Sequence, residues 1–150
     1  IDDVAIATRV KGTGRSCWLG TQRDMLSLRA YDRLGDIVRM VTRTAFVQLR
    51  HRWSLLLATL LGLGLLFVAP PWLALAGALA SSPLSAVFAL AAWGIQSATL
   101  LPVVRHLGVP AAFAATLPAS AALYGAMTAM SAWRHLRGRG PEWKGRTVGG

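Results

Sequence analysis

The chain has 150 residues, of which 54% are hydrophobic, and it carries a formal net charge of +10 at pH 7. Its basic residues border long uncharged apolar stretches, which favours a membrane protein with basic flanks and disfavours nucleic-acid binding as the reason for the charge. The only cysteine, Cys17, excludes an intrachain disulfide and a multi-cysteine metal site. Because the sequence begins with Ile1 rather than Met, we interpret it as a fragment or a processed piece of a longer protein.

Residues 1–31 are predicted to be the remnant of a soluble domain. Two acids at its start favour a short helix over 2–11, because carboxylates are stabilised at a helix N-terminus. A strand bounded by glycines is predicted over 15–20, with Cys17 as a small apolar residue in it, and an irregular polar connection over 21–30. One helix and one strand cannot close a core, so we expect them to complete a sheet whose other strands lie upstream.

Residues 32–52 are predicted to form an amphipathic basic helix, with Asp32 as its N-terminal cap. Its arginines fall largely on the side of the helix opposite the apolar residues, as an interfacial helix among lipid headgroups requires. Packing against a soluble domain is an alternative, and both arrangements can hold at once. The apolar positions at helical spacing are Leu34, Ile37, Val38, Val41, Ala45 and Leu49.

Residues 53–133 are predicted to form the transmembrane region. The chain has no charged residue or histidine from Trp53 to Val104, and none again from Leu107 to Trp133. A hydrocarbon core needs about 20 apolar residues for each helical crossing. The first stretch is therefore long enough for two crossings and the second for one.

Prolines and small polar residues divide this region into pieces. The predicted pieces are a first span from Trp53 to the Pro70–Pro71 pair, a short apolar stretch over 72–80, a turn at 81–83, a second span over 84–104 and a third over 108–133. The two adjacent prolines are predicted to break or kink the first span. Small residues dominate the third span and favour close helix packing. Gln96 is the only strongly polar side chain in any span, and an interhelical hydrogen bond is its predicted use.

The charge pattern and the span count disagree. Basic residues crowd both ends of the chain, which places both ends in the cytoplasm and requires an even number of crossings. Either one proline-containing segment enters and leaves on the same side, buried against protein, or the basic tail over 134–150 departs from the charge preference. We favour three membrane helices and leave the side of the tail open.

The three histidines each stand beside an arginine at the edge of an apolar stretch. Interfacial anchoring is the favoured interpretation, because no spacing among them supports metal ligation. They are His51, His106 and His135.

Several segments follow one another in the order IDDVAIATRVK, GRSCWLG, SLRAYDRLGDIVRMVTRTAFVQLRH, apolar spans with a Pro-Pro break, and WKGR. This order resembles the C-terminal part of membrane-bound family 2 glycosyltransferases, most closely the hopanoid-biosynthesis-associated glycosyltransferases of bacteria and, more distantly, ceramide glucosyltransferases. The resemblance implies a mainly α membrane protein that follows the last helix and strand of a truncated, Rossmann-like α/β catalytic domain. It also implies the bacterial inner (cytoplasmic) membrane, with the catalytic face in the cytoplasm.

In that family an acid pair supplies the general base that deprotonates the acceptor hydroxyl. The resemblance places Asp3 in the role of the base and Asp2 as its neighbour, and a like-charged neighbour raises the basicity of a carboxylate. Simple helix capping by the two acids is the alternative. The resemblance further implies Mg or Mn on the donor diphosphate through the missing upstream domain, with no metal bound by this fragment alone.

Many family members carry a Gln-x-x-Arg-Trp motif on the interfacial helix, which contributes to the diphosphate and acceptor site. This chain departs from it, because Gln48 and the Arg52–Trp53 pair are one residue too far apart. Arg39 or Arg43 would then supply the diphosphate contact through bidentate pairing, although lipid headgroups are an equally suitable partner.

The tail motif of the relatives matches Trp143, Lys144 and Arg146. In the relatives it looks like a closing element near the active site, and a disordered basic tail is the competing interpretation here.

These features lead to one favoured function and two alternatives. The favoured function is the C-terminal part of an inverting glycosyltransferase that moves a sugar from a nucleotide-diphosphate donor to a lipid-like acceptor at the bilayer, inactive as a fragment and without a nucleic-acid partner. A non-enzymatic membrane anchoring or assembly module is the alternative. A transporter fragment is weaker, because the spans hold no ionisable residue.

Overall fold

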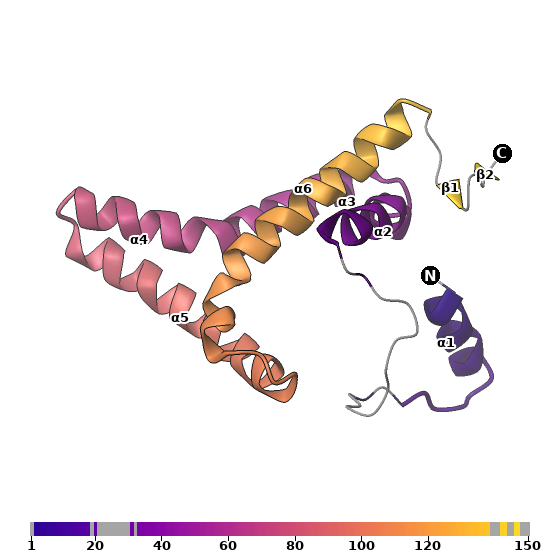
Figure 1. The fold of residues 1–150 in the computed structure, drawn as a ribbon, viewed down its shortest axis with the longest axis horizontal. Helices are drawn as coiled ribbons and strands as arrows, with labels where there is room; N and C mark the ends of the chain where they lie inside the picture. Colours follow the sequence, from indigo (N-terminus) through magenta and orange to yellow (C-terminus); the bar gives the residue numbers. More distant parts are fainter. Residues whose placement is uncertain are drawn as a thin grey trace. The chain divides into compact units, whose positions relative to one another are not determined.

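The computed structural model describes residues 2–18, 20, 31, 33–138, 142–143 and 146–147, with the backbone alone for 2–3 and for the last two pairs. The described chain is mostly helical, as predicted (Figure 1). It divides into two compact units, residues 1–37 and 38–150.

The first unit contains helix α1, Asp2–Gly12, which confirms the predicted helix. Gly14 follows it with φ +79°, a backbone conformation that glycine adopts without strain. The strand predicted over 15–20 is wrong for the described residues there, because Arg15–Trp18 pair with no other described strand. Cys17 is accordingly exposed rather than packed in a sheet. The connection over 21–30 lies outside the described residues.

Helix α2, Leu34–Gln48, confirms the predicted amphipathic helix within narrower bounds. Its buried residues are Thr42, Ala45 and Phe46, whereas Leu34 is 58% exposed. The apolar face of α2 is therefore covered only toward its C-terminal end. The predicted cap, Asp32, lies outside the described residues.

The first apolar helix is longer than predicted. Helix α3, Trp53–Leu63, continues through the π-helical turn η1, Gly64–Val68, into α4, Ala69–Leu79, as one helix of 27 residues. The prediction was a break or a kink at the proline pair, and the break is therefore wrong. The π-helical turn η1 provides the physical reason. In it the Ala69 N–H donates to the Gly64 carbonyl, five residues earlier, so the turn holds one residue more than an α-helical turn and the helix continues through the prolines.

The proline pair leaves one carbonyl without a donor from its own helix. The Leu66 carbonyl would accept from residue 70 in an α-helix and from residue 71 in a π-helix, and both are prolines without an N–H. Gln96 supplies the missing donor through its Nε2 atom. The predicted interhelical hydrogen bond of Gln96 is thus confirmed, and it compensates for the two prolines.

We expect Gln96→Leu to lower the free energy of unfolding by about 1 kcal/mol, because the Leu66 carbonyl then has no donor in an apolar setting. Thermal unfolding in detergent measures this effect. Thr99→Val is the matched control, because the Thr99 hydroxyl donates only to the Gln96 carbonyl within its own helix. Equal midpoints for the two variants would contradict the role of the amide.

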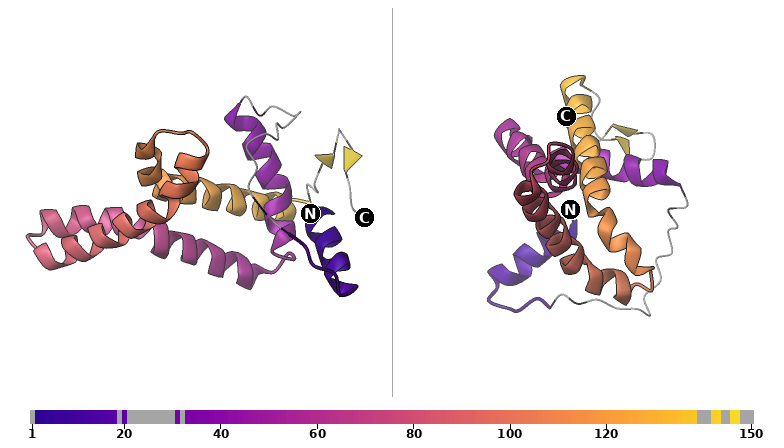
Figure 2. Two further views of the ribbon diagram at one scale, coloured as in Figure 1. Left: turned by 90° about the horizontal axis from the view of Figure 1, so that it is seen from below. Right: turned by 90° about the vertical axis from the view of Figure 1, so that its left-hand side faces the viewer.

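Helix α5, Pro83–His106, corresponds to the second predicted span and is long and apolar enough to cross a membrane, and the turn before it contains Ser81 with φ +53°. Helices α4 and α5 pack side by side as a hairpin (Figures 1 and 2). They approach each other closely at Gly77, where an added Cβ would lie 2.6 Å from Ser85 Oγ and 2.8 Å from the Ala86 backbone nitrogen. The hairpin therefore requires a glycine at this position.

We expect Gly77→Ala to reduce the free energy of unfolding by about 1–3 kcal/mol, because the new methyl group pushes against the backbone of α5. Gly94→Ala is the control, since nothing lies within 4 Å of a Cβ at Gly94. Detergent thermal melts of both variants give the comparison. A Gly77→Ala protein as stable as Gly94→Ala would show that the two helices are not in close contact.

The last helical segment differs from the predicted third span. It consists of the 3₁₀ turn η2, Ala111–Thr116, and helix α6, Leu117–Leu136. Within the described residues only Trp53–Leu79 and Pro83–His106 are long and apolar enough to cross a membrane. A third crossing is therefore not confirmed.

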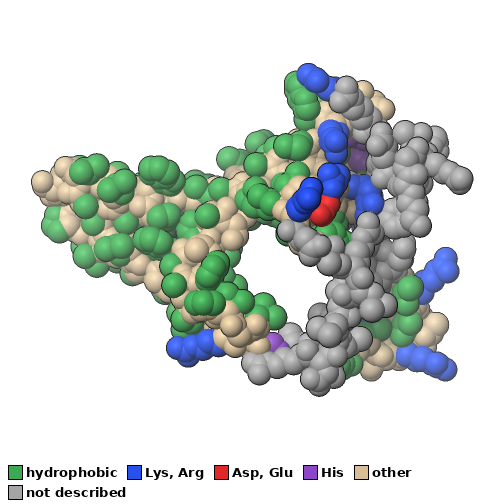
Figure 3. All heavy atoms as spheres, in the orientation of Figure 1, with side chains coloured by type: hydrophobic (Ala, Val, Ile, Leu, Met, Phe, Trp, Pro, Cys, Tyr) green, Lys and Arg blue, Asp and Glu red, His purple; other side chains and the backbone are tan. Residues whose placement is uncertain are grey.

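The two long apolar helices are covered by little protein. Only 11% of the most apolar 18 residues of each is buried within the described chain. Figure 3 shows hydrophobic side chains over α4 and α5, with a basic side chain only at the end of α5, while further basic side chains gather around α2 and the end of α6. This distribution suggests membrane association, because a water-soluble fold would bury such helices.

Candidate functional site

The candidate site begins at the corner between α2 and α3. Arg50 and His51 both adopt positive φ angles, 52° and 54°, which are uncommon for residues with a side chain. The His51 N–H donates to the Phe46 carbonyl over 3.1 Å, and the Arg52 N–H donates to the Leu49 carbonyl over 3.0 Å. These bonds close the end of α2 and set the direction in which α3 leaves it.

Phe46 is the centre of this corner and is 1% exposed. Its ring lies 5.0 Å from the ring of Trp53 and 5.3 Å from each of the rings of His51 and His135, measured between centroids. Leu56 and Ala132 complete the buried cluster with it. One side chain from α2 thus joins the start of α3 to the end of α6.

A polar contact fixes the same junction. The backbone N–H of Phe46 donates to Ser131 Oγ over 3.1 Å, in a buried setting between segments far apart in sequence. Ser131 is 5% exposed. A buried hydrogen bond has a strict geometry, so α6 can dock on α2 in only one register.

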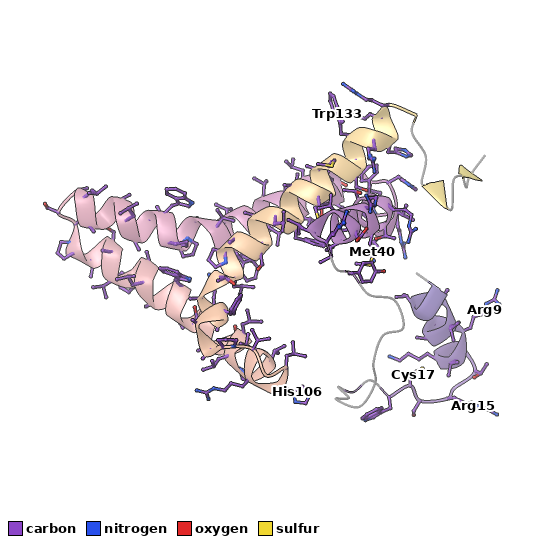
Figure 4. All side chains as sticks on the ribbon, viewed as in Figure 1. Arg9, Arg15, Cys17, Met40, His106 and Trp133 are labelled. Carbon is purple, nitrogen blue, oxygen red and sulfur yellow. The ribbon has the colours of Figure 1, made fainter. Side chains whose placement is uncertain are left out.

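The rings of His51 and His135 stack at 4.5 Å with an interplanar angle of 22°. Nearby on α6, the Arg137 guanidinium lies 4.6 Å from the centroid of the Trp133 ring, and Figure 4 shows Trp133 at the end of that helix. The arginines next to both histidines in sequence are exposed. This end of the second unit therefore combines ring faces with N–H donors suited to phosphate oxygens. The exposed arginines at this end are Arg50 and Arg52 beside His51, Arg134 beside His135, and Arg137 just after α6.

The residues predicted for the diphosphate site have different positions relative to this corner. Trp53 belongs to it, being in contact with Phe46 and 47% exposed. Gln48 and Arg52 are exposed at the end of α2 and just before α3. Arg39 is exposed and Arg43 is half-buried, and their spacing of four residues puts both on one face of α2.

The predicted catalytic acids and the tail motif are described only in their backbone. Asp2 and Asp3 lie in the first turn of α1, in the other unit. In the tail, strand β1, Glu142–Trp143, pairs antiparallel with β2, Arg146–Thr147, and Trp143 lies opposite Arg146. Lys144 lies outside the described residues. The roles predicted for these residues remain predictions.

An apolar groove of about 570 Å³ lies elsewhere, between α4 and α5 near their connecting turn. Pro70, Gly77, Ser85 and Phe88 are among its lining residues. It contains none of the predicted site residues. Across the described residues, no group of three His, Cys, Asp or Glu side chains is placed to hold a metal ion.

Sequence reasoning missed the residues that build the corner. Phe46 was not among the predicted apolar positions of the basic helix, and Ser131 has no distinguishing pattern in the sequence. The pairing of His51 with His135 was also missed. In the sequence, both stand beside an arginine at the edge of an apolar stretch. This signal predicts that both lie at the membrane edge, but it does not predict that their rings touch.

Comparison with family models, with curated proteins and with solved structures found no match for this chain.

Proposed function

We propose that this chain is the membrane-anchoring C-terminal part of an inverting glycosyltransferase, which moves a sugar from a nucleotide-diphosphate donor to a lipid-like acceptor. The helices α3 to α6 anchor the enzyme in the bacterial inner membrane, with the catalytic face in the cytoplasm. The first unit is the end of a Rossmann-like catalytic domain, and Mg or Mn acts on the donor diphosphate in the part upstream.

One observation carries the proposal most directly. The basic helix α2 is joined through a fixed corner to an uncovered apolar helix, so arginines and an interfacial tryptophan meet where hydrocarbon gives way to water. A transferase that takes a sugar nucleotide from water and an acceptor from lipid needs donors for phosphate at that boundary. Arg39, Arg43 and Arg52 are the residues of α2 and its end that we assign to this contact.

In the proposed reaction the acceptor oxygen attacks the anomeric carbon as the bond to the diphosphate breaks, and Asp3 takes the hydroxyl proton. The diphosphate leaves with the bonding electron pair, and arginine N–H groups neutralise part of its charge; a divalent metal held by the upstream part would supply further positive charge. Asp2 raises the basicity of Asp3 through its own negative charge.

The test is a transfer assay on the full-length gene product, using a panel of nucleotide sugars with extracted membrane lipids. Transfer to a lipid with inversion at the anomeric carbon is the expected result. If no donor is consumed while the protein stays in the membrane after carbonate washing, the chain is a non-enzymatic anchoring module. Release by carbonate would overturn the membrane assignment.

A further inference from the structure

Helices α3 and α6 run in opposite directions against each other. His51, just before α3, stacks on His135 near the end of α6, and Leu56 shares a buried cluster with Ala132. Further along α3, a Cβ at Gly125 would lie 3.7 Å from Leu60 and from Leu63. As residue numbers rise along α3, those of the α6 partners fall.

This direction is incompatible with three crossings. In a chain that crosses three times, the first and third spans point the same way, so their partners would rise in number together. Here the first span starts and α6 ends at the same end of the unit. We propose that residues 108–136 form a re-entrant segment, which enters the membrane and returns to the side from which it came, so that the chain crosses only twice.

The depth that this segment reaches follows from two separate contacts. The Trp93 Nε1–H donates to the Ala115 carbonyl over 3.1 Å, so η2 lies beside the middle of α5. Trp93 is ten residues after Pro83, about 15 Å along the helix from the turn between α4 and α5. On the other side, the antiparallel register with α3 puts the start of α6 beside residue 70, again about 15 Å short of that turn.

Several backbone groups of the segment that dips into the membrane are hydrogen-bonded within the protein. The Val109 N–H donates to the Val104 carbonyl, and the Phe113 N–H to the Pro110 carbonyl. The Ala115 carbonyl accepts from Trp93, and the Thr116 hydroxyl donates to the Phe113 carbonyl. Each such bond lowers the cost of placing non-helical backbone at membrane depth.

Two crossings also remove the conflict in the charge pattern. Arg52 before the first crossing, Arg105 at the end of the second, and Arg134 at the end of α6 then share one aqueous side, and the uncharged turn at 81–82 lies on the other. The basic tail over 134–150 consequently lies on the same side as α2. The inference rests on the membrane part of the proposed function and not on glycosyl transfer.

Cysteine labelling in spheroplasts tests this arrangement. The native Cys17 is exposed and precedes the first crossing, so it marks the α2 side. In a Cys17→Ser background, single variants Ser82→Cys and Leu136→Cys mark the turn and the end of α6, both exposed positions. An impermeant maleimide is applied before and after permeabilisation.

We expect Ser82→Cys to be labelled from one side of the membrane, and Cys17 and Leu136→Cys both from the other. Labelling of Leu136→Cys from the same side as Ser82→Cys would establish three crossings and overturn the re-entrant segment. A carbonate wash separates this failure from that of the proposed function. If the wash releases the protein, the protein was never inserted, and the membrane part of the proposed function fails. If the protein is retained and Leu136→Cys is labelled from the same side as the turn, only the re-entrant segment is contradicted.

Discussion

Replacing Phe46 with alanine should lower the free energy of unfolding by about 3–5 kcal/mol, the largest stability effect that we expect in the second unit. The ring is 1% exposed and contacts His51 and Trp53 at the corner before α3 and His135 near the end of α6. Its removal leaves a cavity where α2, α3 and α6 meet. Chemical denaturation in mild detergent, followed by tryptophan fluorescence, reports the loss because Trp53 lies against the ring.

The matched control for this prediction is Leu34→Ala, a truncation on the same helix at a position that is 58% exposed. It should change the free energy of unfolding by less than about 0.5 kcal/mol. Phe46→Leu should retain most of the stability because it keeps much of the buried volume. If Phe46→Ala and Leu34→Ala unfold at the same denaturant concentration, the corner is not a packed junction.

Helix type and approximate helix position followed from the sequence, because the local signals were strong and agreed with one another. The uninterrupted apolar run after the turn at 81–83 was sufficient to predict helix α5. The helical spacing of apolar residues was sufficient to predict helix α2. Gln96 was also correctly interpreted, because a lone amide among apolar residues has few alternatives to a bond with a neighbouring helix.

The features that the sequence did not predict all depend on contacts between distant segments. A break at the Pro70–Pro71 pair was one of two predicted outcomes, and it is wrong; the donor that compensates for the prolines belongs to α5, thirty residues away in the chain. The strand over 15–20 was mispredicted because a strand requires a partner that no local pattern supplies. The direction of α6 is set by Phe46 and Ser131, and neither has a periodic signature.

The candidate site was predictable only in part. Trp53 was predicted at the edge of the apolar region, where aromatic residues are enriched, and it lies against Phe46 in the corner. The arginines of α2 were identified by their charge, which says nothing about which of them meets phosphate. The stacking of His51 on His135 depends on the antiparallel pairing of α3 with α6, and so it follows only from the tertiary structure.

The second large effect concerns catalysis by the full-length enzyme. Asp3→Asn should reduce kcat by about 10²–10⁴-fold, because an amide cannot take the proton of the acceptor hydroxyl. Binding of the nucleotide-sugar donor should change little, since the base contacts the acceptor and not the diphosphate. Initial rates with a saturating donor and a fluorescent lipid acceptor measure kcat, and calorimetric titration with the donor measures Kd.

Asp2→Asn separates catalysis from helix capping. Both acids lie in the first turn of α1, where either carboxylate stabilises the helix N-terminus by a similar amount. If capping were their only role, the two variants would lose the same small stability and retain the same kcat. A base at Asp3 predicts instead that Asp3→Asn is nearly inactive while Asp2→Asn keeps substantial turnover, with its pH–rate profile moved to lower pH because the base has lost a negative neighbour. Undiminished kcat in Asp3→Asn would remove Asp3 from the mechanism and leave the two acids as a cap.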